Sequence, residues 1–137
     1  MLLDSLQTYA GAAYEARTDT AARARSLATD FLRRAAVTGA VRITAETLGA
    51  VQLVVSELVT NVIKYTVGPC VFELELAEDA LEISVWDTDP AHLPMPASPD
   101  ALRPAQHGLE VVHALCRNVT SERRAGGKRV RASLALA

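Results

Sequence analysis

Apolar residues over positions 21–37 fall near one face of a helix, with arginines spread over the rest of its surface, which is the pattern of an amphipathic helix. Asp19 or Thr20 supplies the short polar side chain that commonly caps such a helix, and Gly39 follows its expected end. We therefore expect a helix with one apolar face turned to a core. That face is predicted to carry Ala22, Leu27, Phe31 and Leu32.

A second stretch with helical spacing starts at Thr44 and contains Glu46 and Glu57. It ends at Gly68 and Pro69, because proline cannot continue a helix. The two stretches together predict two long helices in the first half of the chain. The apolar positions of the second are Leu48, Val51, Val55, Leu58, Val62 and Tyr65.

After the second helix, the period of the pattern changes to two, as in a half-buried β-strand. Apolar and polar residues alternate over residues 72–76 and 81–85, with a hairpin turn at 78–80. A third alternating strand covers residues 130–136, after the glycine pair 126–127. The sequence therefore predicts an α+β two-layer sandwich, with a mainly antiparallel sheet covered by helices on one face.

Residues 88–106 hold five of the six prolines and are expected to form one long loop, without a helix or a central strand. Structureless loops of this length in compact domains are commonly binding loops, lids or linkers. A short helix is expected from about Gly108 to Arg117. The organisation is a single domain over residues 1–137, in which residues 1–18 form an N-terminal extension or a strand.

Composition supports a folded domain, since half of the 137 residues are apolar and 22% are charged. The net charge of −2 gives no electrostatic reason to expect nucleic acid or an anionic membrane as partner. Cys70 and Cys116 lack metal-site or CxxC spacing and are expected to be buried free thiols. With no basic leader and no uncharged apolar run of about 18 residues, we expect a cytoplasmic protein.

The segment VVSELVTNVIKYT places Glu57, Asn61 and Lys64 on one side of the second helix, because they are four and three residues apart. An asparagine amide oxygen suits Mg²⁺, which binds through few protein ligands together with substrate phosphates. Glu57 lies one turn earlier and could accept a proton from an attacking hydroxyl or water. The same polar stripe is also typical of an ordinary solvent-facing helix.

The segment SVWDTDP places Asp87 at the end of an apolar strand. An ionised carboxylate only accepts hydrogen bonds, so here it could pair with the exocyclic amine of adenine and reject the carbonyl of guanine. Aspartate is also common in turns, which is the alternative interpretation. Asp89 is assigned to the loop.

The segment QHGLEVV pairs Gly108 with the start of a predicted helix. Helix N-termini offer free N–H groups, and a glycine there lets a phosphate approach the backbone closely. By itself this glycine is equally typical of a loop. His107 and His113, taken alone, are more typical of surface histidines than of catalytic residues.

Taken together and in this order, four segments resemble the motifs of the GHKL, or Bergerat-fold, ATPases. ELVTNVIKYT resembles the N box, WDTDP the first glycine-box aspartate, QHGLEVV the second glycine box and GGKRVRASL the closing strand. The resemblance covers residues 20–136. The preceding LATDFLRRAAV helix and the compact length are most similar to the anti-sigma-factor serine kinase branch that is common in actinobacteria.

This resemblance implies ATP and Mg²⁺ as cofactors, with residues 88–106 as the ATP lid. Glu57 would be the general base, Asn61 the Mg²⁺ ligand and Asp87 the adenine reader. The remaining contacts to the nucleotide are implied for Lys64, His107, Gly108 and Leu109.

Three positions depart from the pattern of this family. Gln106 or His107 stands where relatives have another glycine, and Asp89 stands where many have glycine. Lys128 and Arg129 follow the closing glycines, where a threonine commonly supports the adenine site. These departures bear on how well the site would work as a catalyst.

Two classes of function follow. The first is an ATP-dependent serine/threonine kinase that phosphorylates an anti-sigma-antagonist protein, which the retention of Glu57 favours. The second is an ATP-binding module that sequesters a sigma factor or an antagonist, which Gln106 and Lys128 favour. A sensor histidine kinase is disfavoured, because no dimerisation helix with a phosphoacceptor histidine precedes the domain. No direct nucleic-acid or membrane partner is expected, and a homodimer is left open.

Overall fold

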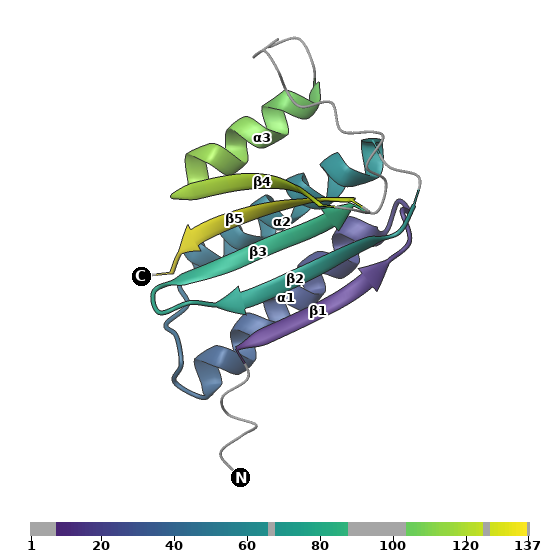
Figure 1. Cartoon of the computed structure of the whole chain (residues 1–137). Coiled ribbons are helices and arrows are strands. Elements are labelled where there is room, and N and C mark those ends of the chain that lie inside the picture. The colour runs from purple at the N-terminus through teal and green to yellow at the C-terminus, as the bar shows by residue number, and fades with distance from the viewer. Residues whose placement is uncertain (1–7, 66–67, 88–103, 125–126, 137) are drawn as a thin grey trace.

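The computed structural model describes residues 8–65, 68–87, 104–124 and 127–136, and it forms two layers (Figure 1). The first half contains one strand and the two long helices, and the second half contains four strands and a shorter helix. In chain order the elements are β1 (Tyr9–Tyr14), α1 (Thr20–Val37), α2 (Ala45–Tyr65), β2 (Cys70–Leu76), β3 (Ala80–Asp87), α3 (Pro104–Leu115), β4 (Asn118–Arg124) and β5 (Gly127–Ala135).

The strands form one antiparallel sheet in the order β1-β2-β3-β5-β4. The hairpin β2–β3 pairs Leu76 with Leu81 at its turn and Cys70 with Asp87 at its open end. In Figure 1, helices α1 and α2 lie behind the sheet. Helix α3 packs beside α2 and is seen above β4, the edge strand of the sheet. The predicted α+β sandwich, with helices on one face of an antiparallel sheet, is therefore confirmed.

Helix α2 is the central element of the core, since it contacts α1, α3 and β3. The Thr44 hydroxyl accepts the Thr47 N–H at 3.0 Å, which caps the helix where the sequence predicted its start. Length and hydropathy alone would also allow Ala45–Lys64 to span a membrane, a test that any apolar core helix can pass. Here the helix buries Val51, Val54, Val55, Leu58, Val59 and Val62 in the core.

Helix α1 spans the predicted residues, and three of the four residues predicted for its apolar face do contact the core, since Phe31 and Leu32 are buried and Leu27 is partly buried against it. Ala22 is exposed, and the residues that face the core are Ala24, Ala28, Phe31, Leu32 and Ala35. Gly39, with φ of 83°, lies just beyond the helix end, a conformation that glycine adopts without the strain of a side chain.

The sequence pattern does not predict β4, and it misplaces the starts of β3 and α3. β4 has the sequence NVTSERR, whose polar residues give no alternating apolar signal, and it is held by pairing with β5. Ala80 belongs to β3 rather than to the hairpin turn.

Helix α3 begins at Pro104, earlier than the predicted start at Gly108, so residues 104–106 are helical rather than part of a loop. Proline suits the first turn of a helix, where its missing N–H has no partner to lose. Gly108 therefore lies in the second turn of α3, not at its first residue. The rest of the predicted lid, residues 88–103, lies outside the described residues.

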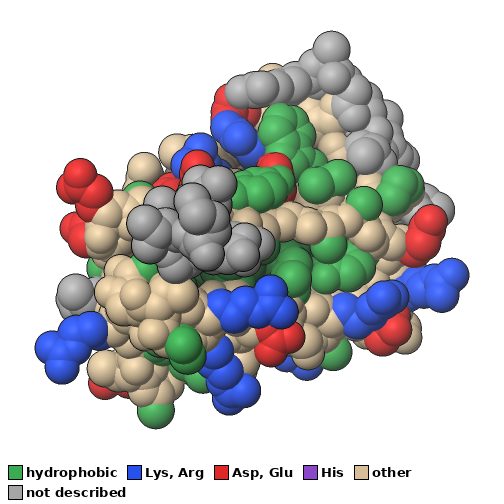
Figure 2. Space-filling model, turned by 90° about the horizontal axis from the view of Figure 1, so that it is seen from below, with side chains coloured by type: hydrophobic (Ala, Val, Ile, Leu, Met, Phe, Trp, Pro, Cys, Tyr) green, Lys and Arg blue, Asp and Glu red, His purple; other side chains and the backbone are tan. Residues whose placement is uncertain are grey.

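The surface carries a mixture of charges. Seen from below, Lys and Arg side chains are scattered among Asp and Glu side chains over the layer edges (Figure 2). This mixture agrees with the small net charge of −2. Exposed large apolar side chains are spread over separate elements, at Tyr9, Val37, Leu53 and Leu115.

Candidate functional site

Elements that carry the candidate site residues meet at one end of the sandwich. In Figure 1 the carboxyl ends of α2 and β3, the start of β5 and the start of α3 all lie at the right-hand end of the molecule. This arrangement follows from the topology, because β3 runs antiparallel to both β2 and β5. Residues far apart in the sequence are thereby brought to a common end of the fold.

Asn61 lies in the last two turns of α2 and is partly buried. Its Oδ1 atom is buried and accepts no hydrogen bond from any described residue. A buried acceptor without a donor costs free energy, and such groups in native proteins commonly serve a ligand or an ion. An amide oxygen of this kind fits a magnesium ion, which prefers oxygen ligands.

Glu57 and Lys64 flank Asn61 along the same helix, as the spacing predicted. Glu57 lies one turn before Asn61 and is partly exposed, and Lys64 lies in the last turn and is exposed. Within the described part of the chain, neither side chain is recorded in a hydrogen bond or an ion pair. A partly exposed carboxylate next to the buried amide is accessible to a reacting hydroxyl.

Asp87 is the last residue of β3 and is only 4% exposed. It lies on the helix-covered face of the sheet, because residues of the same parity on β3 are buried, namely Leu81, Ile83 and Val85. Its neighbours across the sheet are Cys70 on β2 and Lys128 on β5. A carboxylate is thus held at the end of the core, where the sequence placed a strand end.

Burial is the main cause of the pKa shifts of the two groups that lie across the sheet from Asp87, and the charge of Asp87 is a smaller one. Burial, followed by the negative charge of Asp87, raises the pKa of the Cys70 thiol above its usual value. Burial, followed by the positive charge of Arg123, lowers the pKa of Lys128, and Asp87 opposes that shift. By strand register, Cys70, Asp87 and Lys128 form a row across three neighbouring strands, and all three are buried.

The burial of Lys128 is the feature that sequence reasoning missed. The predicted inward positions of the last strand were Val130, Ala132, Leu134 and Leu136, and the same alternation continued by one step reaches Lys128. That signal was present, but lysine is rarely buried and was assigned only as a departure from the family pattern. In the structure Lys128 is 9% exposed.

The α3 residues of the predicted site occupy the first turns of that helix. His107, Gly108 and Leu109 all belong to α3, and α3 packs against α2. Leu109 is partly buried and contacts the core, whereas the side chains of residues 104–108 lie outside the described set. His113 is exposed, which agrees with its assignment to the surface.

Metal binding by a cluster of protein side chains has no support in the described residues. They contain no group of three or more His, Cys, Asp or Glu side chains that could hold an ion. Cys70 and Cys116 are buried free thiols, as predicted. An ion at Asn61 would therefore need most of its ligands from a bound phosphate and from water.

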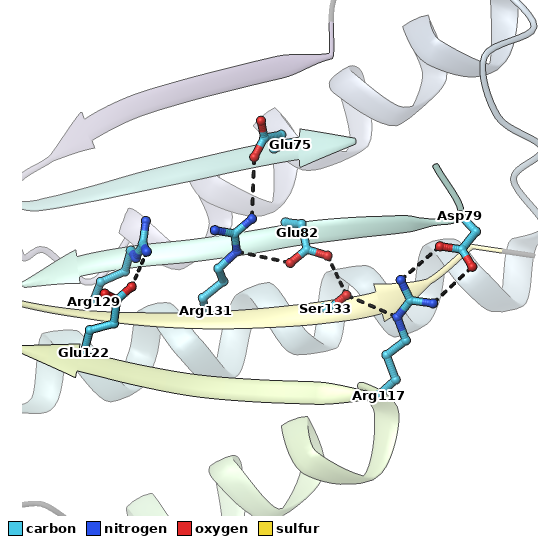
Figure 3. Close-up of polar contacts among 8 residues, drawn as sticks. All are labelled: Glu75, Asp79, Glu82, Arg117, Glu122, Arg129, Arg131 and Ser133. Carbon is cyan, nitrogen blue, oxygen red and sulfur yellow. Dashed lines mark hydrogen bonds and ion pairs between the residues drawn. The ribbon is translucent and has the colours of Figure 1, made fainter. Parts of the chain in front are cut away.

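The opposite face of the sheet carries polar pairs instead of a candidate site (Figure 3). Arg131 donates from Nε to Glu82 at 3.1 Å and also pairs with Glu75 on β2. Arg117 forms two bonds to Asp79, of 2.9 and 3.1 Å. The Arg131 pairs link neighbouring strands on the solvent-facing side of the sheet, and the Arg117 pair ties the β2–β3 turn to the connection between α3 and β4.

Comparison with known proteins finds a match to one protein family. The profile described as "Histidine kinase-like ATPase domain" matches residues 14–134. No curated protein matches the chain. The fold superposes on the structure of the RsbU and RsbW domains of Rv1364c from Mycobacterium tuberculosis with a TM-score of 0.66 and 19% identity, over 93% of this chain and 32% of that one.

Two histidine kinases are also similar. The histidine kinase domain of the blue-light activated histidine kinase from Erythrobacter litoralis EL346 has a TM-score of 0.53 and 20% identity, over 85% of this chain and 59% of that one. Histidine kinase AdeS from Acinetobacter baumannii has a TM-score of 0.50 and 12% identity, over 98% and 72%. At these identities the likeness is one of fold. This chain spans less than two thirds of the length of the first two structures.

Proposed function

The chain belongs to the family of histidine kinase-like ATPase domains, and from this premise we propose that it is an ATP-dependent serine/threonine kinase of the anti-sigma-factor type. Membership of the family makes it an ATP-binding regulatory module. The proposed substrate is a small anti-sigma-antagonist protein, and the proposed location is the cytoplasm. The observation that supports this most strongly is the buried Oδ1 atom of Asn61, which has no hydrogen-bond partner in the described part of the chain, one turn from the partly exposed Glu57.

Each site residue then has a distinct role. Asn61 would hold Mg²⁺ through Oδ1, and Asp87 would accept a hydrogen bond from the base of ATP. Bound Mg²⁺ would supply neutralisation of the phosphate charge. Glu57 would accept the proton of the acceptor serine or threonine hydroxyl, a role that its partial exposure and its position one turn before Asn61 support. Lys64, His107, Gly108 and Leu109 are proposed to contact the nucleotide.

A second candidate is an ATP-binding module that sequesters a sigma factor or an antagonist without useful phosphotransfer. It is favoured by the position of Gly108 in the second turn of α3, where backbone N–H groups are normally used inside the helix. The burial of Lys128 beside Asp87 also favours it, because that pair changes the chemistry of the base site. The two candidates differ in whether Glu57 is needed.

Phosphotransfer from labelled ATP to candidate antagonist proteins, followed by detection of phosphoserine, tests the kinase. Glu57→Ala should retain ATP affinity and lose roughly 10²- to 10⁴-fold in rate, the usual contribution of a general base. Glu46→Ala is the matched control, since Glu46 lies in the first turn of the same helix and is exposed.

ATP binding without transfer to any candidate would favour the module, as would equal rates for wild type and Glu57→Ala. Absence of ATP binding would exclude both candidates.

A further inference from the structure

Lys128 is the one described lysine that the fold buries, and it lies directly across from Asp87 in the β3–β5 register. The two side chains are 9% and 4% exposed. Both lie on the helix-covered face of the sheet, at the end that carries the proposed nucleotide site. Beyond Lys128, the residues of the same parity on β5 and just after it are apolar, and those fully or almost fully buried are Ala132, Leu134 and Leu136.

An apolar residue would fill this position at lower cost than an ammonium group. Burial disfavours the charged form of lysine, and Arg123 on the neighbouring strand adds like-charge repulsion. Asp87 provides the opposing attraction. The buried pair therefore places one group that only accepts hydrogen bonds next to one group that only donates them.

This pairing matters because purines differ at position 6. Adenine presents an amine there, which donates, whereas guanine presents a carbonyl, which accepts. Asp87 alone pairs with the amine and repels the carbonyl, as the sequence predicted. An adjacent ammonium would supply the donor that a carbonyl needs.

We propose that Lys128 is a specificity-determining residue that lets the base site accept 6-oxopurine nucleotides as well as ATP. The inference rests on the proposed nucleotide site. Asp87 serves the amine of adenine, and Lys128 serves the carbonyl of guanine or hypoxanthine. The two residues together replace strict adenine selection by tolerance of both purine types.

Calorimetric titration with ATP, GTP and inosine triphosphate in Mg²⁺ buffer tests the proposal. Inosine triphosphate carries the 6-oxo group without the 2-amino group, so it isolates the contact in question. We expect wild type to bind all three nucleotides within about tenfold of one another. Lys128→Met should lose roughly 10- to 100-fold in affinity for GTP and inosine triphosphate, the usual effect of one hydrogen bond to a charged group, with little change for ATP.

Two further variants separate the contact from general charge effects. Lys128→Arg keeps a donor and should retain GTP binding. Arg123→Met removes a positive charge from the register neighbour of Lys128, one strand farther from Asp87, and should leave the GTP-to-ATP ratio unchanged. Thermal melting of each variant establishes that it is folded, and Lys128→Arg carries the test if Lys128→Met does not fold.

The outcomes distinguish this inference from the function on which it rests. ATP binding with GTP and inosine triphosphate excluded by wild type would overturn the role of Lys128 and leave the ATP site intact. Equal loss of all three nucleotides in Lys128→Met would also overturn it, because the residue would then act on the whole site. Failure of every nucleotide to bind wild type would overturn the proposed function and this inference together.

Discussion

Replacement of Asn61 by leucine should stabilise the free protein and, at the same time, remove the Mg²⁺ dependence of ATP binding. Asn61 is held in α2 between residues that anchor the helix in the core, and its Oδ1 atom is buried without a donor among the described residues. A buried acceptor that has no donor lowers the stability of the ion-free protein, and a bound ion removes that cost. Leucine has the same number and branching of side-chain heavy atoms and leaves no unsatisfied polar atom.

The expected stabilisation by Asn61→Leu follows from the free-energy cost of burying Oδ1 without a donor among the described residues. An unsatisfied buried acceptor costs roughly 1 to 3 kcal/mol, and removing it returns that amount to the free energy of unfolding. For a chain of 137 residues, 1 kcal/mol shifts the melting temperature by about 3 to 5 °C. Asn61→Leu should therefore melt at least about 3 °C above wild type in the absence of ATP.

Thermal melting with and without saturating ATP, in Mg²⁺ and in EDTA, measures both effects. Saturation at 100 times the dissociation constant stabilises a protein by about 2.7 kcal/mol, which is easily detected. Wild type should gain more from ATP in Mg²⁺ than in EDTA, and Asn61→Leu should gain equally in both.

Gln52→Leu is the matched control, since Gln52 is an amide on the same helix whose Nε2 donates to Thr29 at 3.1 Å. Its replacement should destabilise the protein by about 0.5 to 1.5 kcal/mol, because a satisfied hydrogen bond is lost. A melting temperature of Asn61→Leu at or below that of wild type would refute the claim that Oδ1 is unsatisfied. A retained difference between Mg²⁺ and EDTA would place the metal away from Asn61.

Three further predictions concern single groups. Asp87→Asn should weaken ATP binding by roughly 1 to 3 kcal/mol in calorimetry, and an unchanged affinity would remove Asp87 from the site. Burial raises the pKa of Cys116 to about 11 and also raises that of Cys70, so both thiols should react slowly with a thiol reagent near neutral pH and rapidly in denaturant. The Arg117 guanidinium lowers the pKa of Asp79 from 3.8, so the stabilisation from this pair should be complete above that pH and lost below it. The difference in urea midpoint between wild type and Asp79→Asn should therefore shrink on acidification, and a constant difference would contradict the pairing.

The elements that periodicity predicted are those whose two faces differ. Helix α2 and the strands β2, β3 and β5 each present one side to the core, so their apolar residues recur at regular steps. The antiparallel pairing of β2 and β3 could be predicted because the two strands follow one another through a short turn. In each of these cases the local pattern and the tertiary burial agree.

The elements that escaped prediction depend on tertiary pairing. β4 is an edge strand with mostly exposed side chains, and its hydrogen bonds to β5 hold it in place. The first turn of α3 lies in a proline-rich segment for which composition predicts a loop, although proline is well suited to the first turn of a helix. Composition alone does not distinguish these two uses of proline.

The candidate site divides in the same way. The positions of Glu57 and Asn61 on one helix and of Asp87 at a strand end follow from spacing and were predictable. The isolation of the Asn61 oxygen and the burial of Lys128 arise only when α2, β3 and β5 are assembled. They are properties of the fold that no single segment contains.

Polar side chains on the solvent-facing side of the sheet are mostly paired, whereas those on the helix-covered side are buried with fewer partners among the described residues. This difference indicates where the site lies. On the solvent-facing side, the carboxylate of Glu73 accepts from both Trp86 and Tyr9 at 2.6 Å, and Arg129 stacks 5.0 Å above the Trp86 ring and pairs with Glu122. Among the buried polar atoms of the described residues on this side, only the Arg129 Nε atom lacks a partner, and the Nη2 atom of the same guanidinium pairs with Glu122.

On the helix-covered side, by contrast, the Asn61 oxygen has no hydrogen-bond partner among the described residues, and a buried lysine lies across the β3–β5 register from a buried carboxylate. Protein interiors rarely keep such groups unless they serve a function, since an apolar residue would be more stable. The unpaired and buried polar groups therefore mark the end of the sandwich at which a charged ligand is expected to bind.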